Sequence, residues 1–332
     1  MASLIEHDAL PRHGRPAPVA RTFGWLMLTV LAAFLVNNVL VVAFGFPGLR
    51  GIGAEGGVLG FVSLALYAAA LGLAVFIVVL SPNRSIRWDA HLIHSFNTYL
   101  VRALFWSIFL VGLFDATIAF LRAEELTVPL FGEAIGHGLT RSNVIGPWVH
   151  VPLIVVSFVI ALFTRTLGFP WLALLIVAAE LLIVISRFVF SYEQALMGDL
   201  VRYWYAALFL FASAYTLYEE GHVRVDILYA GLGRTTRGYL NAQGTILLGL
   251  TTAWVILWIA FNGPQSIVNA PVKNFEISQA GPFGMYVKYQ MAAFIGLFGV
   301  TMLIQFVSYF FDAVADWHDE PGHRAPGQPS AH

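Results

Sequence analysis

Long apolar runs recur along the whole chain, and they limit the folds available to it more than any other feature. Each run is close to the roughly 20 apolar residues that an α-helix needs to cross the hydrocarbon core of a bilayer. Eight such runs can be traced, at residues 23–46, 57–80, 98–121, 148–163, 169–190, 200–217, 240–262 and 287–311. The sequence therefore predicts an all-α, polytopic integral membrane protein with about eight transmembrane helices.

Charge content agrees with this fold class. Hydrophobic residues make up 58% of the chain and charged residues 11%, whereas soluble domains contain about 25% charged residues. Ionised groups are expensive inside a bilayer, so a chain that lies mostly in lipid must carry few of them. The fourth run is the weakest, because it is short and contains His150 and Pro152, and a seven-span fold is the alternative.

Several functional classes are excluded by what the sequence lacks. The net charge of −1 comes without any basic stripe, which argues against a nucleic-acid partner. The absence of cysteine excludes disulfides and thiolate chemistry. The spans contain no facing histidines for haem, and there is no HExxH, GxSxG or phosphate-loop motif. We therefore expect no enzyme activity, no catalytic residue, no bound metal and no cofactor.

The arginines give an orientation. Arg12, Arg15 and Arg21 precede the first run, which is too long for the roughly 7–15 apolar residues of a cleavable signal peptide and so predicts an uncleaved helix. A cytoplasmic N-terminus places eleven of the 18 Lys and Arg residues on the cytoplasmic side, as the positive-inside rule favours. Eight spans then put the C-terminus in the cytoplasm too, where the polar tail 317–332 is predicted to be disordered.

Two pairs of charged residues fall inside predicted spans. Asp115 lies seven residues before Arg122, and Glu180 lies seven residues before Arg187, so each pair shares one helix face. Intramembrane charges are either part of an ion or proton pathway or structural contacts to a neighbouring helix. The structural interpretation is favoured for both pairs, and His150 is expected at the membrane interface.

Two connections between spans stand out. Residues 122–147 are polar and rich in glycine, and they are too long for a simple helix hairpin. In contrast, RTLGFP at 165–170 predicts a tight turn, because Gly168 favours a helix stop and Pro170 a restart. No matched pair of Gly/Pro-broken spans, which would indicate a transporter site at the bilayer midplane, is found.

The segment YEEGHVRVDILYAGLG, residues 218–233, concentrates charge between two apolar runs. It is too polar to span the membrane and too apolar for a free loop, so it predicts a short amphipathic helix lying on the membrane surface. Its charged and ionisable residues are candidate contacts to a partner or to lipid headgroups: Glu219, Glu220, His222, Arg224 and Asp226. Arg187 is a further candidate interface residue.

The same part of the chain resembles a known family. RFVF at 187–190 is followed by RYWYAALFLFASAYTLYEEGHVRVDILYAGL and then by RTTRGYLN. This order is similar to that of the small membrane (Q-type) subunit of tripartite ATP-independent periplasmic (TRAP) transporters, whose His-Val-Arg-Val-Asp-like signature corresponds to residues 222–226. The family's Glu before its second helix has Glu193 or Asp199 as its candidate here.

The resemblance implies a partner system and a division of labour. A periplasmic binding protein would deliver an organic acid to a large membrane subunit, which imports it with a sodium gradient across a bacterial inner membrane. The small subunit would be a scaffold that binds neither substrate nor sodium, and its last four spans would hold the large subunit. The charged segment 218–233 would then brace that partner.

The resemblance divides the chain into four regions: a cytoplasmic segment 1–21, an additional membrane region of about four spans at 22–165, a small-subunit-like four-helix region at 166–316, and the tail 317–332. The additional region inherits no role from the family. Two other functions stay open: an autonomous ion-coupled transporter using Asp115, Glu180 and Arg187, and a structural membrane assembly factor.

Overall fold

The computed structural model describes residues 11–52, 57–165, 167–193, 195–218, 229–278 and 281–323. These residues form helices and no strand. Eight helical segments are long and apolar enough to cross a membrane: α2 (Pro18–Phe44), α3 (Gly57–Leu80), α4 (Ile86–Ala123), α6 with α7 (Ser142–Phe163), α8 (Phe169–Val189), α9 (Ala195–Tyr218), α10 with α11 (Arg234–Ala260) and α13 (Lys288–Trp317). The predicted all-α membrane fold with about eight candidate spans is confirmed, and the fourth run lies in a helical segment of 22 residues that is long enough to cross a membrane.

Shorter elements complete the described chain. Helix α6 (Ser142–Ile145) passes through a π-helical turn (Gly146–His150) into α7 (Val151–Phe163), and α10 (Arg234–Gly244) passes through a second π-helical segment (Thr245–Leu250) into α11 (Thr251–Ala260). Short 3₁₀ turns lie at Leu49–Gly51, Tyr229–Gly231 and Gly281–Phe283, and α12 spans Asn269–Lys273. The polar connection 122–147, expected to be a loop, instead contains α5 (Thr127–Gly138) and α6, with a break at Gly132, whose φ is 77°.

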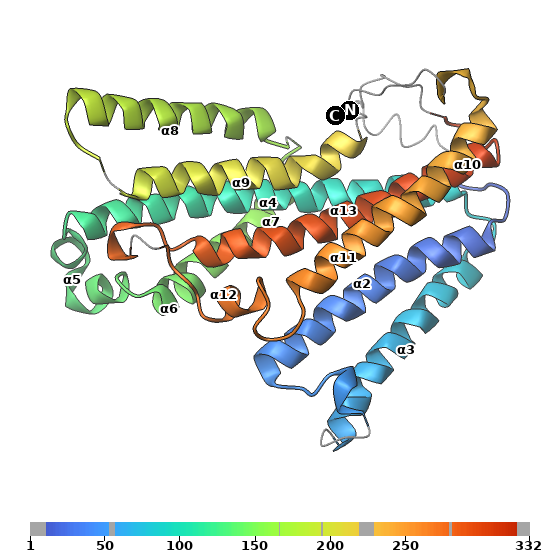
Figure 1. Ribbon diagram of the computed structural model, residues 1–332, viewed down its shortest axis with the longest axis horizontal. Coiled ribbons are helices and arrows are strands. Elements are labelled where there is room, and N and C mark those ends of the chain that lie inside the picture. Colours follow the sequence, from blue (N-terminus) through green and yellow to red (C-terminus); the bar gives the residue numbers. More distant parts are fainter. Residues whose placement is uncertain are drawn as a thin grey trace. The chain divides into compact units, whose positions relative to one another are not determined.

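The described residues form two compact units, each of which draws on both halves of the sequence. Unit 1 comprises residues 1–97, 214–266 and 299–332, and unit 2 comprises residues 98–213 and 267–298. The first unit contains α2 and α3, which pack side by side in Figure 1. Each unit therefore combines helices of the additional N-terminal region with helices of the small-subunit-like region.

Buried ion pairs explain why some helices in unit 1 extend beyond the apolar runs. Helix α4 begins at Ile86, about three turns before its apolar run. Its Asp89 accepts a hydrogen bond from the fully buried Arg21 at 2.8 Å. Its Arg87 lies 3.2 Å from Asp312 and 2.7 Å from Asp316, both on α13. The polar ends of α4 and α13 thus satisfy one another, and neither helix has to stop where the apolar residues end.

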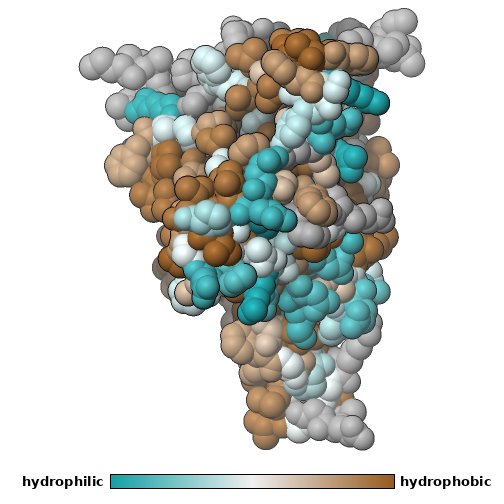
Figure 2. Space-filling view, turned by 90° about the vertical axis from the view of Figure 1, so that its left-hand side faces the viewer, coloured by the Kyte–Doolittle hydropathy of each residue, from teal (hydrophilic) through white to brown (hydrophobic). Residues whose placement is uncertain are grey.

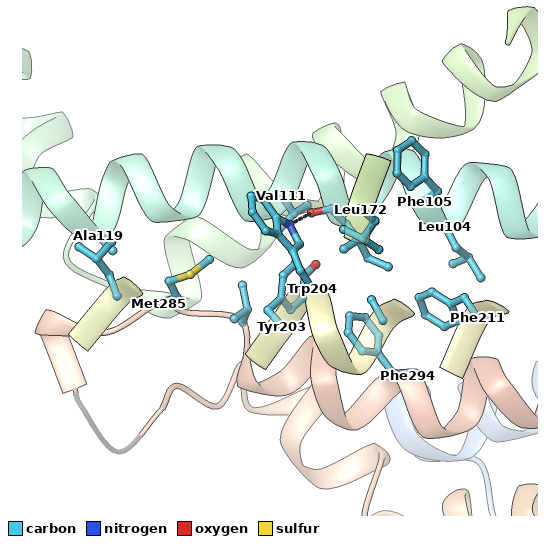
Figure 3. Packing of buried hydrophobic residues seen from close by; sticks show 14 residues of the cluster. Leu104, Phe105, Val111, Ala119, Leu172, Tyr203, Trp204, Phe211, Met285 and Phe294 are labelled. Carbon is cyan, nitrogen blue, oxygen red and sulfur yellow. Dashed lines mark hydrogen bonds between the residues drawn. The ribbon is translucent and has the colours of Figure 1, made fainter. Parts of the chain in front are cut away.

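The core of unit 2 is an apolar cluster between α4, α8, α9 and the start of α13. Figure 3 shows Trp204 and Tyr203 of α9 between Val111 of α4 and Phe294 of α13. The Trp204 indole donates a hydrogen bond to the carbonyl of Ile108 at 3.3 Å. Gly112 lies where a β-carbon would come within 2.5 Å of that indole nitrogen, so α4 and α9 approach closely at this level.

Helix α7 ends at Phe163 and α8 begins at Phe169, as the turn predicted at 165–170 requires. Gly168 has a φ of 74° at the start of α8, a left-handed conformation that glycine adopts without strain. A β-carbon there would lie 2.3 Å from the ring of Phe105. The residue is therefore required both by the backbone conformation and by the packing of α8 on α4.

Large apolar side chains cover much of the exterior of the helices. Exposed examples include Phe76 at 57% and Trp171 at 62% of their full accessibility. In the view of Figure 2, brown hydrophobic areas alternate with patches of teal hydrophilic residues. An exterior this apolar is stable in lipid and not in water, as expected for membrane-spanning helices.

Candidate functional site

Asp115 is the most completely buried carboxylate of unit 2, with no exposed surface, and it lies on α4. One of its oxygens accepts a hydrogen bond from the backbone N–H of Tyr286 at 2.6 Å. Its other oxygen lies 3.3 Å from Nε2 of His150, close enough for an ion pair but without hydrogen-bond geometry. A carboxylate held by a backbone N–H in this way fixes the segment that precedes α13 against α4.

His150 continues this contact into a chain of polar side chains. Its Nδ1 lies 2.8 Å from the hydroxyl of Tyr289, which accepts a hydrogen bond from the amide of Gln290 at 3.1 Å. The amide oxygen of Gln290 accepts from the hydroxyl of Tyr203 at 2.5 Å. The buried polar cluster Asp115–His150–Tyr289–Gln290–Tyr203 therefore joins α4, the π-helical turn before α7, α13 and α9. His150, expected at the membrane interface, is fully buried instead.

Arg122 reaches the same segment two turns further along α4. Its guanidinium donates to the carbonyl of Gly284 at 2.8 Å and to that of Leu139 at 3.3 Å. It also lies 3.7 Å from the centre of the Tyr286 ring, a cation–π contact. Asp115 and Arg122, predicted to share one helix face, are thus brought together on the short segment 284–286.

Tyr286 also contacts the connection between α5 and α6. Its hydroxyl donates to the carbonyl of Thr140 at 2.9 Å. Burial raises the pKa of the Tyr286 phenol above its ordinary value, and the nearby Arg122 charge opposes that shift in part. The phenol therefore stays protonated at neutral pH and remains available as a donor.

Asp199 provides a second anchor for the same connection. One of its oxygens accepts hydrogen bonds from the backbone N–H of Met285 and from the hydroxyl of Ser278, both at 3.0 Å. Arg202, one turn later on α9, lies 3.7 Å from its other oxygen. Glu193, the other candidate for the family's acidic position, lies 3.6 Å from Arg187 on the surface. Of the two acids, only Asp199 is buried.

The second predicted pair, Glu180 and Arg187, has a different setting. Both residues are exposed on α8. Arg187 lies near the end of the helix, beside Glu193, whereas Glu180 has no hydrogen bond or ion pair within the described part of the chain. The remaining predicted interface residues lie outside the described residues: Glu219, Glu220, His222, Arg224 and Asp226. The surface helix proposed for that segment stays a prediction.

Sequence reasoning missed most of the buried polar cluster. Tyr203, Tyr289 and Gln290 lie near the ends of apolar runs and are easily taken for interfacial residues. The available signal was His150, a histidine inside a span, because a buried ionisable group requires polar partners. Among the described residues, no group of three or more His, Asp or Glu residues could hold a metal ion.

The fold and these contacts define a multi-span helical membrane protein whose buried polar groups in unit 2 hold its own helices and connections together. Residues 174–316 match the family model described as tripartite ATP-independent periplasmic transporters, DctQ component. This region covers less than half of the chain and is similar to the DctQ-type small component of TRAP transporters, the family that its motifs resemble. We call residues 174–316 the DctQ-type region. Helices α2–α7 precede it. Comparison with curated proteins and with solved structures found no match.

Proposed function

We propose that this chain is the scaffold subunit of a sodium-driven TRAP transporter in a bacterial inner membrane. It supports a large membrane subunit, which imports an organic acid delivered by a periplasmic binding protein, and it binds neither the substrate nor sodium. The DctQ-type region supports membership of such a transporter. Sodium coupling, the organic acid and the scaffold role are proposals that rest on the family resemblance.

One observation supports the scaffold role in particular. The intramembrane polar groups that could form a coupling site are used internally: Asp115 holds the backbone of Tyr286, and Arg122 holds the carbonyl of Gly284. A group that fixes the fold through the backbone is poorly suited to bind and release an ion in each transport cycle. Within the buried polar cluster, two side-chain atoms lack a hydrogen bond, Oδ1 of Asp115 and Nε2 of His150, and they face each other at 3.3 Å.

Proteoliposomes can test this function with the full chain. Uptake of a labelled organic acid should require the chain, the large subunit and the binding protein together, and should follow an inward sodium gradient. Asp115→Asn should leave the number of sodium ions per substrate unchanged. Uptake by the chain alone would establish the autonomous transporter instead, and unchanged uptake in cells that lack the chain would favour an assembly factor.

The orientation is also part of the proposal. Both termini are placed in the cytoplasm, so the connection between α9 and α10 lies on the cytoplasmic side and that between α11 and α13 on the periplasmic side. The excess of arginine on the proposed cytoplasmic side supports this assignment.

A further inference from the structure

One face of α8 carries exposed residues at a regular spacing, and one of them is the acidic Glu180. Five exposed residues follow one another at intervals of four and three, the spacing of a seam along which two helices pack: Ala173, Val177, Glu180, Val184 and Arg187. We call these five residues the α8 seam. Three of them are small or β-branched, which allows close approach of a second helix.

The α8 seam is distinct from the face with which α8 contacts its own unit. Only Leu172 and Ser186 of α8 are buried, and the partly buried Ile176 and Ala179 pack with Leu172 on the apolar cluster. At about 100° per residue, the seam lies roughly a quarter turn from that face. The seam residues are exposed, with the ion pair of Arg187 to Glu193 as a surface contact, whereas the neighbouring face of α8 packs on the apolar cluster.

Glu180 gives the seam its chemical character. It is the twelfth residue of a 21-residue span, so it lies near the middle of the roughly 30 Å hydrocarbon core. Arg187, near the end of the helix, can extend to the headgroups and already lies beside Glu193. A carboxyl group at the depth of Glu180 has no headgroups or water within reach, and no partner within the described part of the chain. Facing lipid alone, it would be strongly unfavourable.

A second copy of the same chain does not fit this face. Two copies in one membrane have the same orientation, so their α8 helices would run parallel. Glu180 would then face Glu180 and Arg187 would face Arg187 across the symmetry axis, and like charges repel. The occupant that complements the seam is a membrane helix of a different protein, with a cationic or hydrogen-bond-donating side chain near the midplane.

We propose that the α8 seam docks a transmembrane helix of the large membrane subunit, and that a Lys, Arg or amide donor of that helix binds Glu180. This inference rests on the proposed function, because it takes the occupant to be the transporter's large subunit. Asp115 and Asp199, the buried acidic residues of unit 2, already bind backbone N–H groups. Glu180 lies in the middle of a span and has no hydrogen bond or ion pair within the described part of the chain, so it is available for an intermolecular contact.

Cross-linking can map the occupied face, because the chain contains no cysteine. Single cysteines at Ala173 and Val184 sample the seam, and cysteines at Leu174 and Leu182 sample exposed positions elsewhere on α8. After labelling with a benzophenone maleimide and illumination, Ala173→Cys and Val184→Cys should cross-link to the co-expressed large subunit. Cross-links only from Leu174→Cys and Leu182→Cys, or from the seam to a second copy of the chain, would overturn the proposal.

Substitution of Glu180 tests its role in the contact. Glu180→Ala should reduce the large subunit that co-purifies with the tagged chain at least tenfold, and Glu180→Gln should reduce it less because an amide still accepts a hydrogen bond. Leu182→Ala is the matched control and should leave co-purification unchanged. Thermal unfolding of each purified variant should match the unsubstituted chain, because the exposed Glu180 makes no hydrogen bond or ion pair within the described part of the chain. Unchanged co-purification of Glu180→Ala would refute the inference.

The two proposals fail in different ways. If the unsubstituted chain does not retain the large subunit, the scaffold function is wrong and the inference falls with it. If the unsubstituted chain retains the large subunit but neither cross-linking from the seam nor substitution of Glu180 affects it, the scaffold function stands and the α8 seam is not the docking surface.

Discussion

Replacing Asp115 is the sharpest test of whether the buried polar cluster stabilises the protein. Asp115→Ala removes the acceptor of the Tyr286 backbone N–H, which lies 2.6 Å from the carboxylate. An unsatisfied buried donor costs about 1–3 kcal/mol. The substitution also removes the carboxylate 3.3 Å from His150 and the negative charge near the cationic Arg122, and breaking a buried charge pair costs about 3–5 kcal/mol. We expect a loss of about 3 kcal/mol.

Asp115→Asn separates the hydrogen bond from the charge. The amide oxygen can still accept from Tyr286, so this variant removes the negative charge beside His150 and Arg122 while it keeps the acceptor. We expect Asp115→Asn to lower the free energy of unfolding less than Asp115→Ala does, because no buried donor is left unsatisfied. Unfolding in mixed micelles with increasing SDS, followed by circular dichroism, measures both variants. A loss of 3 kcal/mol lowers the ratio of folded to unfolded protein more than a hundredfold.

The control for this experiment lies on the same helix. Leu113 is 47% exposed, and Leu113→Ala should change stability by no more than about 0.5 kcal/mol. If Asp115→Ala costs no more than Leu113→Ala, the carboxylate does not hold the segment before α13. If Asp115→Asn costs as much as Asp115→Ala, the charge and not the hydrogen bond is the stabilising element.

Three further predictions follow from other contacts. Gly168→Ala should lower the free energy of unfolding by about 2 kcal/mol or more, because Gly168 has a φ of 74° and a β-carbon there would lie 2.3 Å from Phe105. Gly72→Ala, in open space on α3, is the control and should leave stability unchanged in the same unfolding assay. Arg21→Ala should lower the free energy of unfolding by about 3–5 kcal/mol, since it leaves the buried Asp89 with Arg84 at 3.6 Å as its nearest cation. Replacing both Arg21 and Asp89 should recover part of that loss. If the double variant recovers none of it, the two residues are not coupled. In intact cells, an impermeant maleimide should label Gln265→Cys but not Thr235→Cys, both exposed positions of a cysteine-free chain; the reverse pattern would invert the topology.

The spans were predictable because burial in lipid imposes a simple requirement. Each needs an apolar run of nearly fixed length, and all eight runs form helices. The helix ends were less predictable, since α4 starts at Ile86 and α13 continues to Trp317. Those extensions depend on ion pairs such as Arg87 with Asp316, which join residues more than 200 positions apart. No local pattern reveals such partners.

For the candidate site, the sequence predicted which residues share a helix face but not which groups they bind. The spacing of Asp115 and Arg122 correctly placed them on one face, but their partners are backbone groups of the segment 284–286, which has no distinctive sequence. Similarly, the connection 122–147 looks polar and irregular, yet its apolar residues, such as the buried Ile145, allow short helices to form. Tertiary contacts decided both outcomes.

The buried contacts bear on what the additional N-terminal region does. The family resemblance gives it no role, but Asp115, Arg122 and His150 all belong to it, and all three bind residues 284–289, within the DctQ-type region. Removing residues 22–165 would leave Tyr289 and the backbone N–H of Tyr286 without these partners in the interior of unit 2. A buried unsatisfied donor is costly in lipid, where no water can replace the lost partner. The additional helices are therefore an integral part of this folded unit, and a truncated chain that lacks them should be less stable than the full chain.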